Sequence, residues 1–307
     1  MNGVAHNLKG RTCVITGATS GIGRATAIAL SEAGADLLLI GRRENIGKAL
    51  AAKLQRRSGT GHVEFLHADI SDQKQVRSLA QSIRAKYERL DVLINNAGAK
   101  FDTFQKSADG VELTFATNYL GHFLLTALLL EPLVQSENGR VITLGSGAHV
   151  GIDAPAKWCL GPDNYERKLA YGISKLADIA FAYELARRLN DTRVVCNAVD
   201  PGGVATNLGR NNGLLGWCRH LGYYIMKRQL IRARRGAETV VFLATNPAMG
   251  SVSGKYFYQK SPVESSPASH DRDATQKLWS LSLNLTKSQD FGGMACQNVS
   301  SSAIAAH

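Results

Sequence analysis

The chain has 307 residues, 44% of them hydrophobic, a size and composition that suit one compact α/β domain with a buried core. Lysine and arginine number 36 against 25 aspartate and glutamate residues, so the net charge of +11 favours anionic ligands or surfaces. No zinc-finger spacing, RNP signature or basic-aromatic repeat accompanies this charge, and we therefore expect no nucleic-acid partner.

Cysteine usage and the start of the chain indicate the compartment. The five cysteines are scattered and include no C-x-x-C pair, which argues against a disulfide framework and against a bound metal. Residues 1–9 contain no apolar run that resembles a signal peptide, and no stretch approaches the ~20 apolar residues of a spanning helix. We expect a soluble, cytoplasmic protein whose contact with membranes is at most peripheral.

Short β-branched runs alternate along the chain with longer segments of helical period. This pattern predicts βαβ units, and hence an α/β fold with a doubly wound parallel sheet covered by helices on both faces. Helices fill most of the gaps, and Ser71 and Asp109 are predicted as helix N-caps, the second paired with Glu112 in a capping box. Seven strands are predicted, at residues 12–16, 37–40, 63–67, 92–95, 141–144, 194–199 and 255–258.

Two longer segments interrupt this alternation, at residues 150–168 and 207–235. In an open α/β sheet, the loops after the carboxyl ends of the strands surround the ligand crevice, so both segments are expected there. We interpret residues 207–235 as a mobile lid within one domain that spans residues 1–286. From Lys287 onward the chain is rich in Ser, Gly, Asn and Ala, which predicts a flexible tail over residues 287–307.

A glycine-rich run follows the first predicted strand and opens a helix. Gly17 permits a tight turn, Gly21 lets the backbone approach a pyrophosphate, and Gly23 lets the helix pack on the strand. The helix N-terminus favours the negative charge of phosphates, so a dinucleotide site is the preferred interpretation over a structural turn. The predicted cofactor contacts in this run are Gly17, Thr19, Ser20, Gly21, Ile22 and Gly23.

The end of the second predicted strand indicates which dinucleotide binds. An NAD enzyme usually places an acidic residue here to accept hydrogen bonds from the ribose 2′-hydroxyl, whereas this chain has Gly41. Glycine leaves room for a phosphate, and the guanidinium of Arg42 could bind one. The alternative is that Arg42 and Arg43 are solvated charges at a helix start. Since the acid is missing, we predict NADP(H) as the cofactor.

Small and polar residues follow the third and fourth predicted strands, on the edge where the cofactor is expected. Asp69 could accept a hydrogen bond from the adenine amino group, and small residues allow the ribose to approach the backbone closely. The alternatives are a helix N-cap for Asp69 and an ordinary turn for the glycine. The predicted cofactor contacts here are Asp69, Ile70, Asn96, Ala97 and Gly98.

Tyr171 and Lys175 are four residues apart in a segment of helical character, so they share one helix face. A free tyrosine has a pKa of ~10, and a neighbouring ammonium favours the ionised phenol, which makes Tyr171 a candidate general acid and base. Ser146 follows the fifth predicted strand, where its hydroxyl and the phenol could hold one substrate oxygen. Asn118 is a weak helix former inside a predicted helix, where it could open a backbone carbonyl to a water. Packing and solvated roles for these residues remain the alternatives.

Taken together and in this order, the motifs of residues 8–286 resemble the short-chain dehydrogenase/reductase family. The resemblance implies a Rossmann-type domain and a catalytic tetrad of Asn118, Ser146, Tyr171 and Lys175. It further implies that Lys175, with Tyr171, contacts the nicotinamide ribose and that Asn118 holds a proton-relay water. The segment Asp200-Pro201-Gly202 matches the family's Pro-Gly segment beside the nicotinamide. The cofactor contacts implied there are Pro201, Gly202, Val204 and Thr206.

Within that family the chain is most similar to the retinol dehydrogenase-like reductases, which share the run from Asn118 to Phe123 and the long gap between Ser146 and Tyr171. The resemblance implies hydride transfer between NADP(H) and a carbonyl or alcohol on a medium-sized apolar substrate, in a homodimer or homotetramer. The alternatives are a non-catalytic NADP(H)-binding regulatory or scaffold protein, and an epimerase or dehydratase on the same scaffold. The expected substrate pocket consists of Ser146, His149, Leu214, Leu221 and Ile225.

Overall fold

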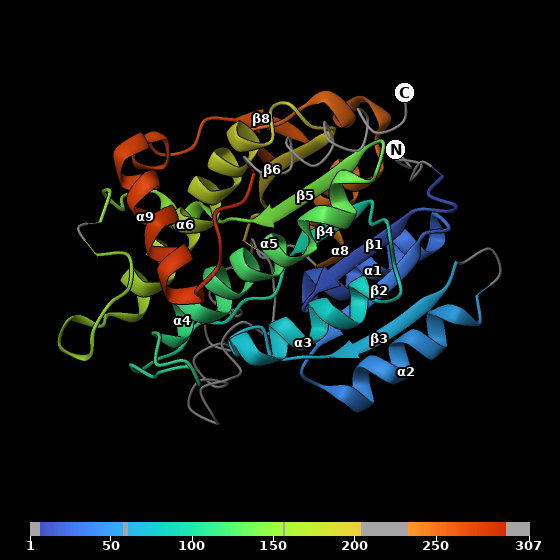
Figure 1. The fold of residues 1–307 in the computed structure, drawn as a ribbon, viewed down its shortest axis with the longest axis horizontal. Helices are drawn as coiled ribbons and strands as arrows, with labels where there is room; N and C mark the ends of the chain where they lie inside the picture. The colour runs from blue at the N-terminus through green and yellow to red at the C-terminus, as the bar shows by residue number, and fades with distance from the viewer. Residues whose placement is uncertain (1–6, 58–60, 156, 204–232, 293–307) are drawn as a thin grey trace.

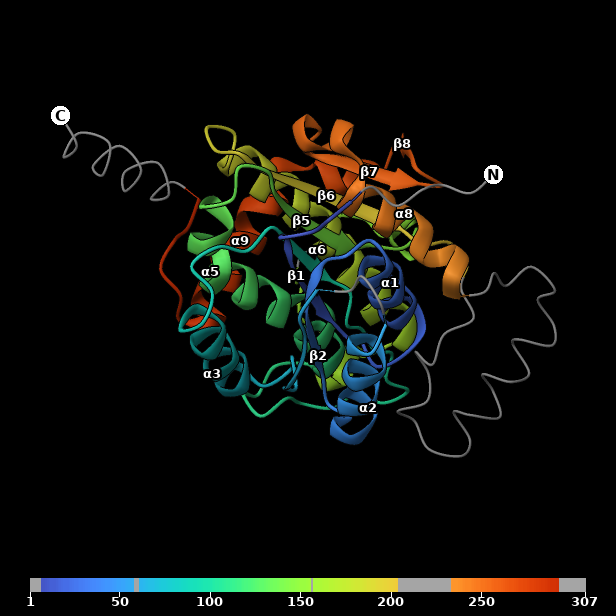
Figure 2. The same ribbon diagram turned by 90° about the vertical axis from the view of Figure 1, so that its right-hand side faces the viewer.

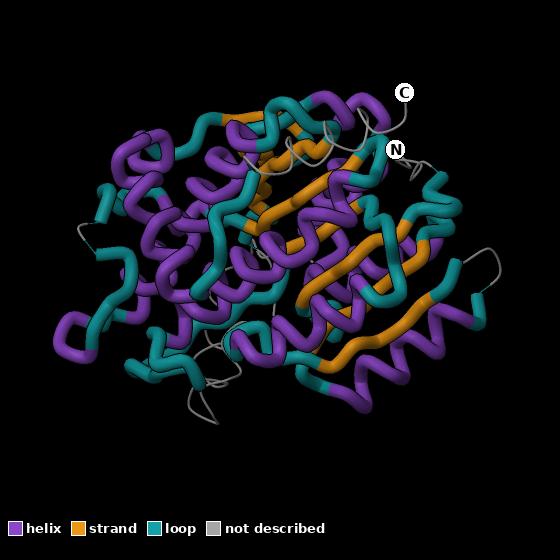
Figure 3. Tube along the Cα trace, viewed as in Figure 1, coloured by secondary structure: helices purple, strands orange, loops and turns teal. Residues whose placement is uncertain are grey.

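The computed structural model describes residues 7–57, 61–155, 157–203 and 233–292. Their strands form one sheet with the order β3-β2-β1-β4-β5-β6-β7-β8, and strand and helix alternate along the chain (Figures 1 and 3). The first seven strands are parallel, and the order reverses between β1 and β4. The strands are β1 (Thr12–Thr16), β2 (Asp36–Gly41), β3 (Val63–His67), β4 (Val92–Asn95), β5 (Gly139–Leu144), β6 (Val194–Asp200), β7 (Lys255–Tyr258) and β8 (Ser261–Val263).

The sequence predicts the fold class and the seven parallel strands correctly, but not the eighth strand. β8 pairs antiparallel with β7, has three residues that are all exposed, and contains Pro262. A strand that short shows no alternation of apolar and polar residues, which is the signal that identified the other strands.

Helices cover both faces of the sheet (Figure 2). The side chains of β1 explain why its sequence is apolar throughout: Val14 packs into the core on one face, while Cys13 and Ile15 pack into the core on the other. One face carries α1 (Gly21–Glu32), α2 (Glu44–Gln55) and α8 (Ala233–Thr245). The other carries α3 (Gln73–Arg84), α4 (Leu113–Phe115), the π-helical turn η1 (Ala116–Leu120), α5 (Gly121–Val134), α6 (Arg167–Arg188) and α9 (Arg272–Thr286).

Both predicted N-caps are wrong by a few residues. The cap of α3 is Asp72, whose carboxylate accepts from the backbone N–H groups of residues 74 and 75, while the neighbouring Ser71 donates to Asp69. The cap of α4 is Glu112, because its carboxylate accepts from the backbone N–H groups of residues 114 and 115. Asp109 lies in the preceding turn and accepts from the N–H of residue 73. The capping-box pattern was present, but Glu112 acts as the cap itself.

One apolar helical stretch contradicts the expectation that no segment is long enough to span a membrane. Leu113–Val134, which comprises α4, η1 and α5, is long and apolar enough to cross a membrane, but most of it is buried inside the protein. A helix that is hydrophobic on all sides is either a core helix or a membrane span. Here it packs between the sheet and its neighbours α3 and α6, so burial in the core accounts for its composition.

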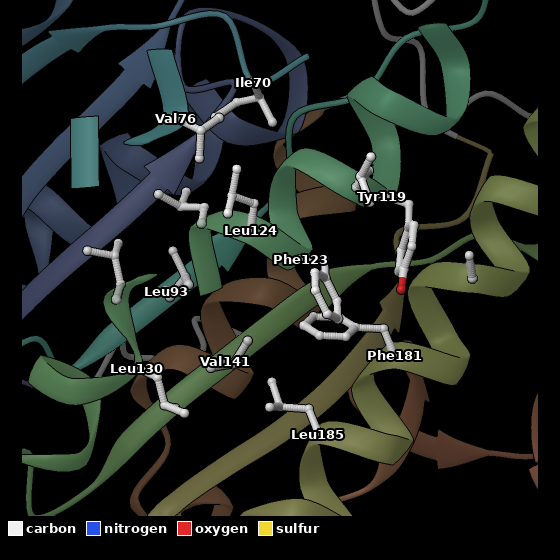
Figure 4. Packing of buried hydrophobic residues seen from close by; sticks show 14 of the residues in the cluster. Ile70, Val76, Leu93, Tyr119, Phe123, Leu124, Leu130, Val141, Phe181 and Leu185 are labelled. Atoms are coloured by element: carbon white, nitrogen blue, oxygen red, sulfur yellow. The ribbon is translucent and has the colours of Figure 1, made fainter. Parts of the chain in front are cut away.

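Phe123 of α5 is the centre of an aromatic cluster, and Figure 4 shows it beside Phe181 of α6. Its side chain is fully buried, and its ring centroid lies 5.6 Å from that of Phe181 on α6. It also lies 5.1 Å from Trp279 on α9 and 5.0 Å from Phe291, which follows that helix. The start of the predicted tail is therefore packed on the core, while residues 293–307 lie outside the described part of the chain.

We expect Phe123→Ala to lower the free energy of unfolding by about 3–5 kcal/mol, because it removes the central ring of this cluster and leaves a cavity. Urea denaturation followed by fluorescence measures the change. Phe104→Ala is the matched control, since the Phe104 ring is partly exposed and meets Tyr165 at 6.0 Å. A loss from Phe123→Ala no larger than that of the control would contradict the central role of this ring.

Candidate active site

The glycine-rich run lies at the switch point between β1 and β4, and its backbone explains two of its glycines. Gly17 and Gly21 have φ values of +67° and +54°, in the left-handed region that favours glycine. Gly23 lies so close to the loop that a Cβ on it would come within 2.5 Å of the carbonyl oxygen of Gly17. Ser20 is the N-cap position of α1, so the predicted turn and helix start are where the sequence placed them.

Hydrogen bonds to Thr16 tie the glycine-rich run to the loop after β4. The buried hydroxyl oxygen of Thr16 accepts from the backbone N–H groups of Asn96 and Ala97, both at 2.9 Å. The side-chain amide of Asn96 donates to the carbonyl of Thr16 at 2.6 Å. A Cβ on Gly98 would approach the side chain of Asn118 at 3.5 Å. The loop after β4 is thus held between the glycine-rich run and the helix that carries Asn118.

His122 extends this network, and its tautomer follows from its partners. Its Nδ1 lies 2.8 Å from the carbonyl oxygen of Asn118, which can only accept, so Nδ1 carries the proton. Burial lowers the pKa of His122 to about 4, so the ring is neutral at physiological pH. The unprotonated Nε2 then accepts from the hydroxyl of Thr16 at 2.9 Å. The neutral ring joins the end of β1 to the backbone of Asn118.

Two arginines follow the carboxyl end of β2, one in contact with the glycine-rich run and the other with the residue that follows β3. A guanidinium nitrogen of Arg43 donates to the carbonyl and the hydroxyl of Thr19, each at 3.2 Å. Arg42 pairs with Asp69 at 3.5 Å, and both side chains are partly exposed. A Cβ on Gly41 would approach the Thr19 methyl group at 3.0 Å. Sequence reasoning singled out Arg42, but the structure places Arg43 against the loop as well.

Asn118 lies in η1, and its buried side chain is fully engaged with the backbone of the loop after β4. The amide oxygen accepts from the N–H of Ala99 at 2.7 Å, and the amide nitrogen donates to the Ala99 carbonyl at 3.0 Å and to Ser174 at 2.9 Å. A π-helical turn is rare and often occurs at functional sites. The sequence indicated an unusual position for Asn118, but it did not predict the π-helical turn.

Tyr171, Ser146 and Lys175 come together where α6 meets the end of β5. Burial raises the pKa of the Tyr171 phenol, while Lys175 and a hydrogen bond from Ser146 lower it. The ammonium of Lys175 lies 5.8 Å from the centre of the Tyr171 ring and donates to the carbonyl of Leu144 at 2.8 Å. The ammonium of Lys100 lies 4.3 Å from the same ring centre. The structure therefore places two of the predicted site residues, Ser146 and Lys175, and a second cation around the phenol of Tyr171.

A comparison with known proteins agrees with this geometry. The family model of the short chain dehydrogenases matches residues 11–214. The chain belongs to the short-chain dehydrogenase family. It is therefore an oxidoreductase of the NAD(P)-dependent short-chain type, as the motifs led us to expect.

Individual members of the short-chain dehydrogenase family match most of the chain. Human retinol dehydrogenase 12 is 37% identical over 278 residues, which cover 91% of this chain and 87% of that protein. A crystal structure of an uncharacterised protein from Mycobacterium paratuberculosis has 30% identity and a TM-score of 0.70, with 93% and 97% of the two chains covered. A short-chain dehydrogenase from Sphingobium yanoikuyae in complex with NADPH has 26% identity and a TM-score of 0.61, covering 76% of this chain and 83% of the other.

His149, expected in the substrate pocket of this short-chain dehydrogenase, is buried and has both ring nitrogens engaged. Nε2 accepts from the backbone N–H of Ser266 at 3.0 Å, so Nδ1 is protonated and donates to the carbonyl of Ser146 at 2.7 Å. The ring therefore connects the turn η2 (Gly147–His149) to η6 (Pro267–His270) and supports the backbone of Ser146.

Part of the predicted site lies outside the described residues. Among the nicotinamide contacts, Gly202 has a φ of +76°, and its N–H donates to the carboxylate of Asp200 at 2.8 Å. Of the predicted lid, residues 233–235 begin α8. The calls that fall outside the described part of the chain are Val204, Thr206, Leu214, Leu221, Ile225 and the rest of the lid, residues 207–232.

The buried neutral His122 predicts a pH dependence of stability. An unfolded histidine takes up a proton below pH ~6.5, whereas burial delays protonation of His122 to about pH 4. The unfolded state binds more protons between these two pH values. The contribution of His122 to the free energy of unfolding is therefore complete above pH ~6.5 and falls as the pH drops, by about 3 kcal/mol in total. Urea unfolding at a series of pH values should show a steeper acid loss in the parent than in His122→Gln.

Comparison with the variant is needed because burial raises the pKa of Asp178. The contribution of Asp178 to the free energy of unfolding therefore falls as the pH rises, opposite to that of His122. His62→Gln is the control, since the His62 side chain is 62% exposed and should leave the slope as it is. Parallel pH profiles for the parent and His122→Gln would contradict a neutral buried ring.

Proposed function

We propose that this protein is an NADP(H)-dependent oxidoreductase that interconverts a carbonyl, either an aldehyde or a ketone, with the corresponding alcohol on a medium-sized apolar substrate. The observation that carries the proposal is the arrangement of Ser146, Tyr171 and Lys175 at the carboxyl end of β5, next to a glycine-rich run that opens α1. An open α/β sheet binds its ligand at this edge, beside the switch point.

The residues around the glycine-rich run fit a dinucleotide phosphate. Gly17 and Gly21 adopt left-handed backbone conformations, and Gly23 leaves no space for a side chain, so the backbone lies open to a pyrophosphate at the start of α1. Arg42 and Arg43 place two guanidinium groups beside Gly41, where a carboxylate would repel a 2′-phosphate. Relatives of this fold include one solved with NADPH. The remaining contacts that we propose are Thr19, Ser20, Ile22, Asp69, Ile70, Asn96, Ala97, Gly98, Pro201 and Gly202.

The bound nicotinamide would supply or accept the hydride, and the protein would move the proton. Ser146 and Tyr171 hold the substrate oxygen, and Tyr171 donates its phenolic proton as the carbonyl is reduced, or takes it up as the alcohol is oxidised. Burial raises the pKa of the phenol and makes it a poorer acid, and Lys175 and Ser146 oppose this rise without cancelling it, so the proposed proton transfer depends on these two residues. Asn118 supports this centre through its hydrogen bonds to Ala99 and Ser174.

The extent of the catalytic domain, the assembly and the compartment are further parts of the proposal. We propose that residues 1–286 act as one catalytic domain in a homodimer or homotetramer. We also propose a cytoplasmic, water-soluble protein, since the apolar stretch Leu113–Val134 is buried in the core. Turnover of a carbonyl substrate would argue against the alternative of a non-catalytic NADP(H)-binding scaffold.

The cofactor assignment predicts that Arg42→Ala and Arg43→Ala each weaken the binding of NADPH more than the binding of NADH. A charge-assisted hydrogen bond contributes about 1.5–3 kcal/mol, so kcat/KM for NADPH should fall about 10- to 100-fold while the value for NADH stays nearly unchanged. Steady-state kinetics with both cofactors measures the two ratios. Arg57→Ala is the control, because Arg57 lies beyond the far end of α2 and pairs with Glu32. Equal losses for both cofactors would contradict recognition of the 2′-phosphate.

The proposed chemistry predicts that Tyr171→Phe abolishes most turnover without loss of the cofactor. General acid and base catalysis contributes about 10²- to 10⁴-fold, so kcat should fall by that factor while the Kd for NADPH stays near the parent value. An aldehyde and ketone screen followed by nicotinamide absorbance supplies the substrate for this measurement. Tyr183→Phe on the same helix is the control, because its hydroxyl contacts Ser265 instead. A Tyr171→Phe enzyme with most of its activity would show that the phenol is not the proton donor.

A further inference from the structure

Asp178 is a buried acid that the proposed reaction does not use. It lies one turn after Lys175 on α6, and its Oδ2 accepts from the Lys175 ammonium at 2.8 Å. The two side chains are 1% and 6% exposed, so this ion pair is enclosed by protein. The second oxygen, Oδ1, is also buried and makes no hydrogen bond with any described part of the chain. Within the described residues, the carboxylate thus has one ionic partner, Lys175.

Stability does not explain this arrangement. Taking two charges out of water costs several kcal/mol per ion, and a buried ion pair recovers that cost only when its remaining hydrogen-bonding groups are satisfied. Here Oδ1 of Asp178 has no hydrogen-bond partner among the residues that the structure describes. Burial raises the pKa of the Asp178 carboxyl, and the ammonium of Lys175 opposes that rise. A role in the adjoining site is therefore the better explanation for a charge at this position.

The effect of Asp178 on Lys175 has a definite sign. Burial, the largest single effect, would by itself lower the pKa of Lys175 by disfavouring the ammonium, but the charge and hydrogen bond of Asp178 oppose it, and with the smaller effects of Tyr171 and Asp200 they raise the pKa. The hydrogen bonds of Lys175 also favour the protonated form, because the carbonyl of Leu144 and the carboxylate of Asp178 accept from two of the three N–H groups of the ammonium. One donor is left for Tyr171 or a ligand.

The other charged and titratable groups around the pair do not replace this function. The Tyr119 phenol and the His122 ring are held neutral by burial, which raises the first pKa and lowers the second. Asp200 is engaged with Tyr256 and with the N–H of Gly202. The groups that interact with the pair are Tyr171 on α6, Tyr119 on η1, His122 on α5 and Asp200 at the end of β6, and Lys100 contacts the Tyr171 ring.

We propose that Asp178 is the fixed counter-ion of Lys175, which keeps the lysine protonated and holds its ammonium between the end of β5 and Tyr171. Asp178 is a positioning residue in this scheme, because it acts on Tyr171 through Lys175. The inference rests on the proposed function for its importance in turnover, but the protonation state of Lys175 can be measured without a substrate.

The direct test follows Lys175 by NMR in protein labelled with carbon-13 at lysine Cε, with Lys175→Met used to assign the signal. In the parent, the Lys175 signal should keep its protonated shift to a higher pH than the signals of the exposed lysines, because its pKa is raised above the usual ~10.4. In Asp178→Asn, burial is no longer opposed by the carboxylate, and the signal should titrate at a pH at least about one unit lower.

The kinetic test uses the same variant. For alcohol oxidation with NADP⁺, the loss of kcat/KM at high pH that follows deprotonation of Lys175 should move down by about the same one unit, while KM near neutral pH stays close to the parent value. If no substrate is turned over by the parent, the proposed function fails, but the NMR titration still decides the role of Asp178.

Glu184→Gln is the matched control, since Glu184 is another buried, ion-paired carboxylate on α6, with Arg187 and Arg188 as its partners. It should leave the Lys175 signal and the pH profile unchanged. If Asp178→Asn does not fold, Asp178→Ser removes the same charge and leaves room for a water beside the ammonium, with the same expected shift. The proposal would be overturned if Lys175 titrated at the same pH in a folded Asp178 variant as in the parent. It would also be overturned if Glu184→Gln lowered the titration pH of Lys175 as much as the Asp178 variants do.

Discussion

The hydroxyl of Thr16 fixes the elements around the switch point of the sheet. It accepts two backbone N–H groups from the loop after β4, and its proton lies within reach of the ring of His122 and the carbonyl of Ile94, so one buried oxygen serves four partners. A buried backbone N–H group without a hydrogen-bond partner costs about 1–3 kcal/mol. The hydroxyl of Thr16 therefore stabilises the loop after β4 in the position where its two N–H groups reach this oxygen. The glycine-rich run, the loop at Asn96 and the π-helical turn with Asn118 all take their positions from it.

This constraint explains which parts of the site the sequence could predict. Strands, the glycine-rich run and the spacing of Tyr171 and Lys175 are local patterns, so periodicity and short motifs were enough to place them on their elements. The second arginine, Arg43, is not among the predicted cofactor contacts, because nothing local indicates that its guanidinium reaches Thr19. His122 and Asp178 were missed as contributors because their partners are 106 residues away in one case and unmarked by any motif in the other.

The errors in the fold have a similar origin. Ser71 and Asp109 are good cap residues by type, but Asp72 and Glu112 reach the free N–H groups, and a shift of one to three residues cannot be read from composition. The π-helical turn at Asn118 depends on how α5 packs between the sheet and α6. Tertiary contacts decide that geometry, whereas helical propensity at Asn118 indicates only that the residue is out of place.

The antiparallel strand β8 has a consequence for how copies of this protein can meet. An open parallel sheet ends in rows of unpaired backbone groups, and a flat exposed edge invites a strand from another molecule. At one edge of this sheet the last strand has only three residues and includes Pro262, two features with which natural sheets blunt an edge. A continuous sheet through that edge is therefore disfavoured, which leaves contacts between helical surfaces as the route to any assembly on that side.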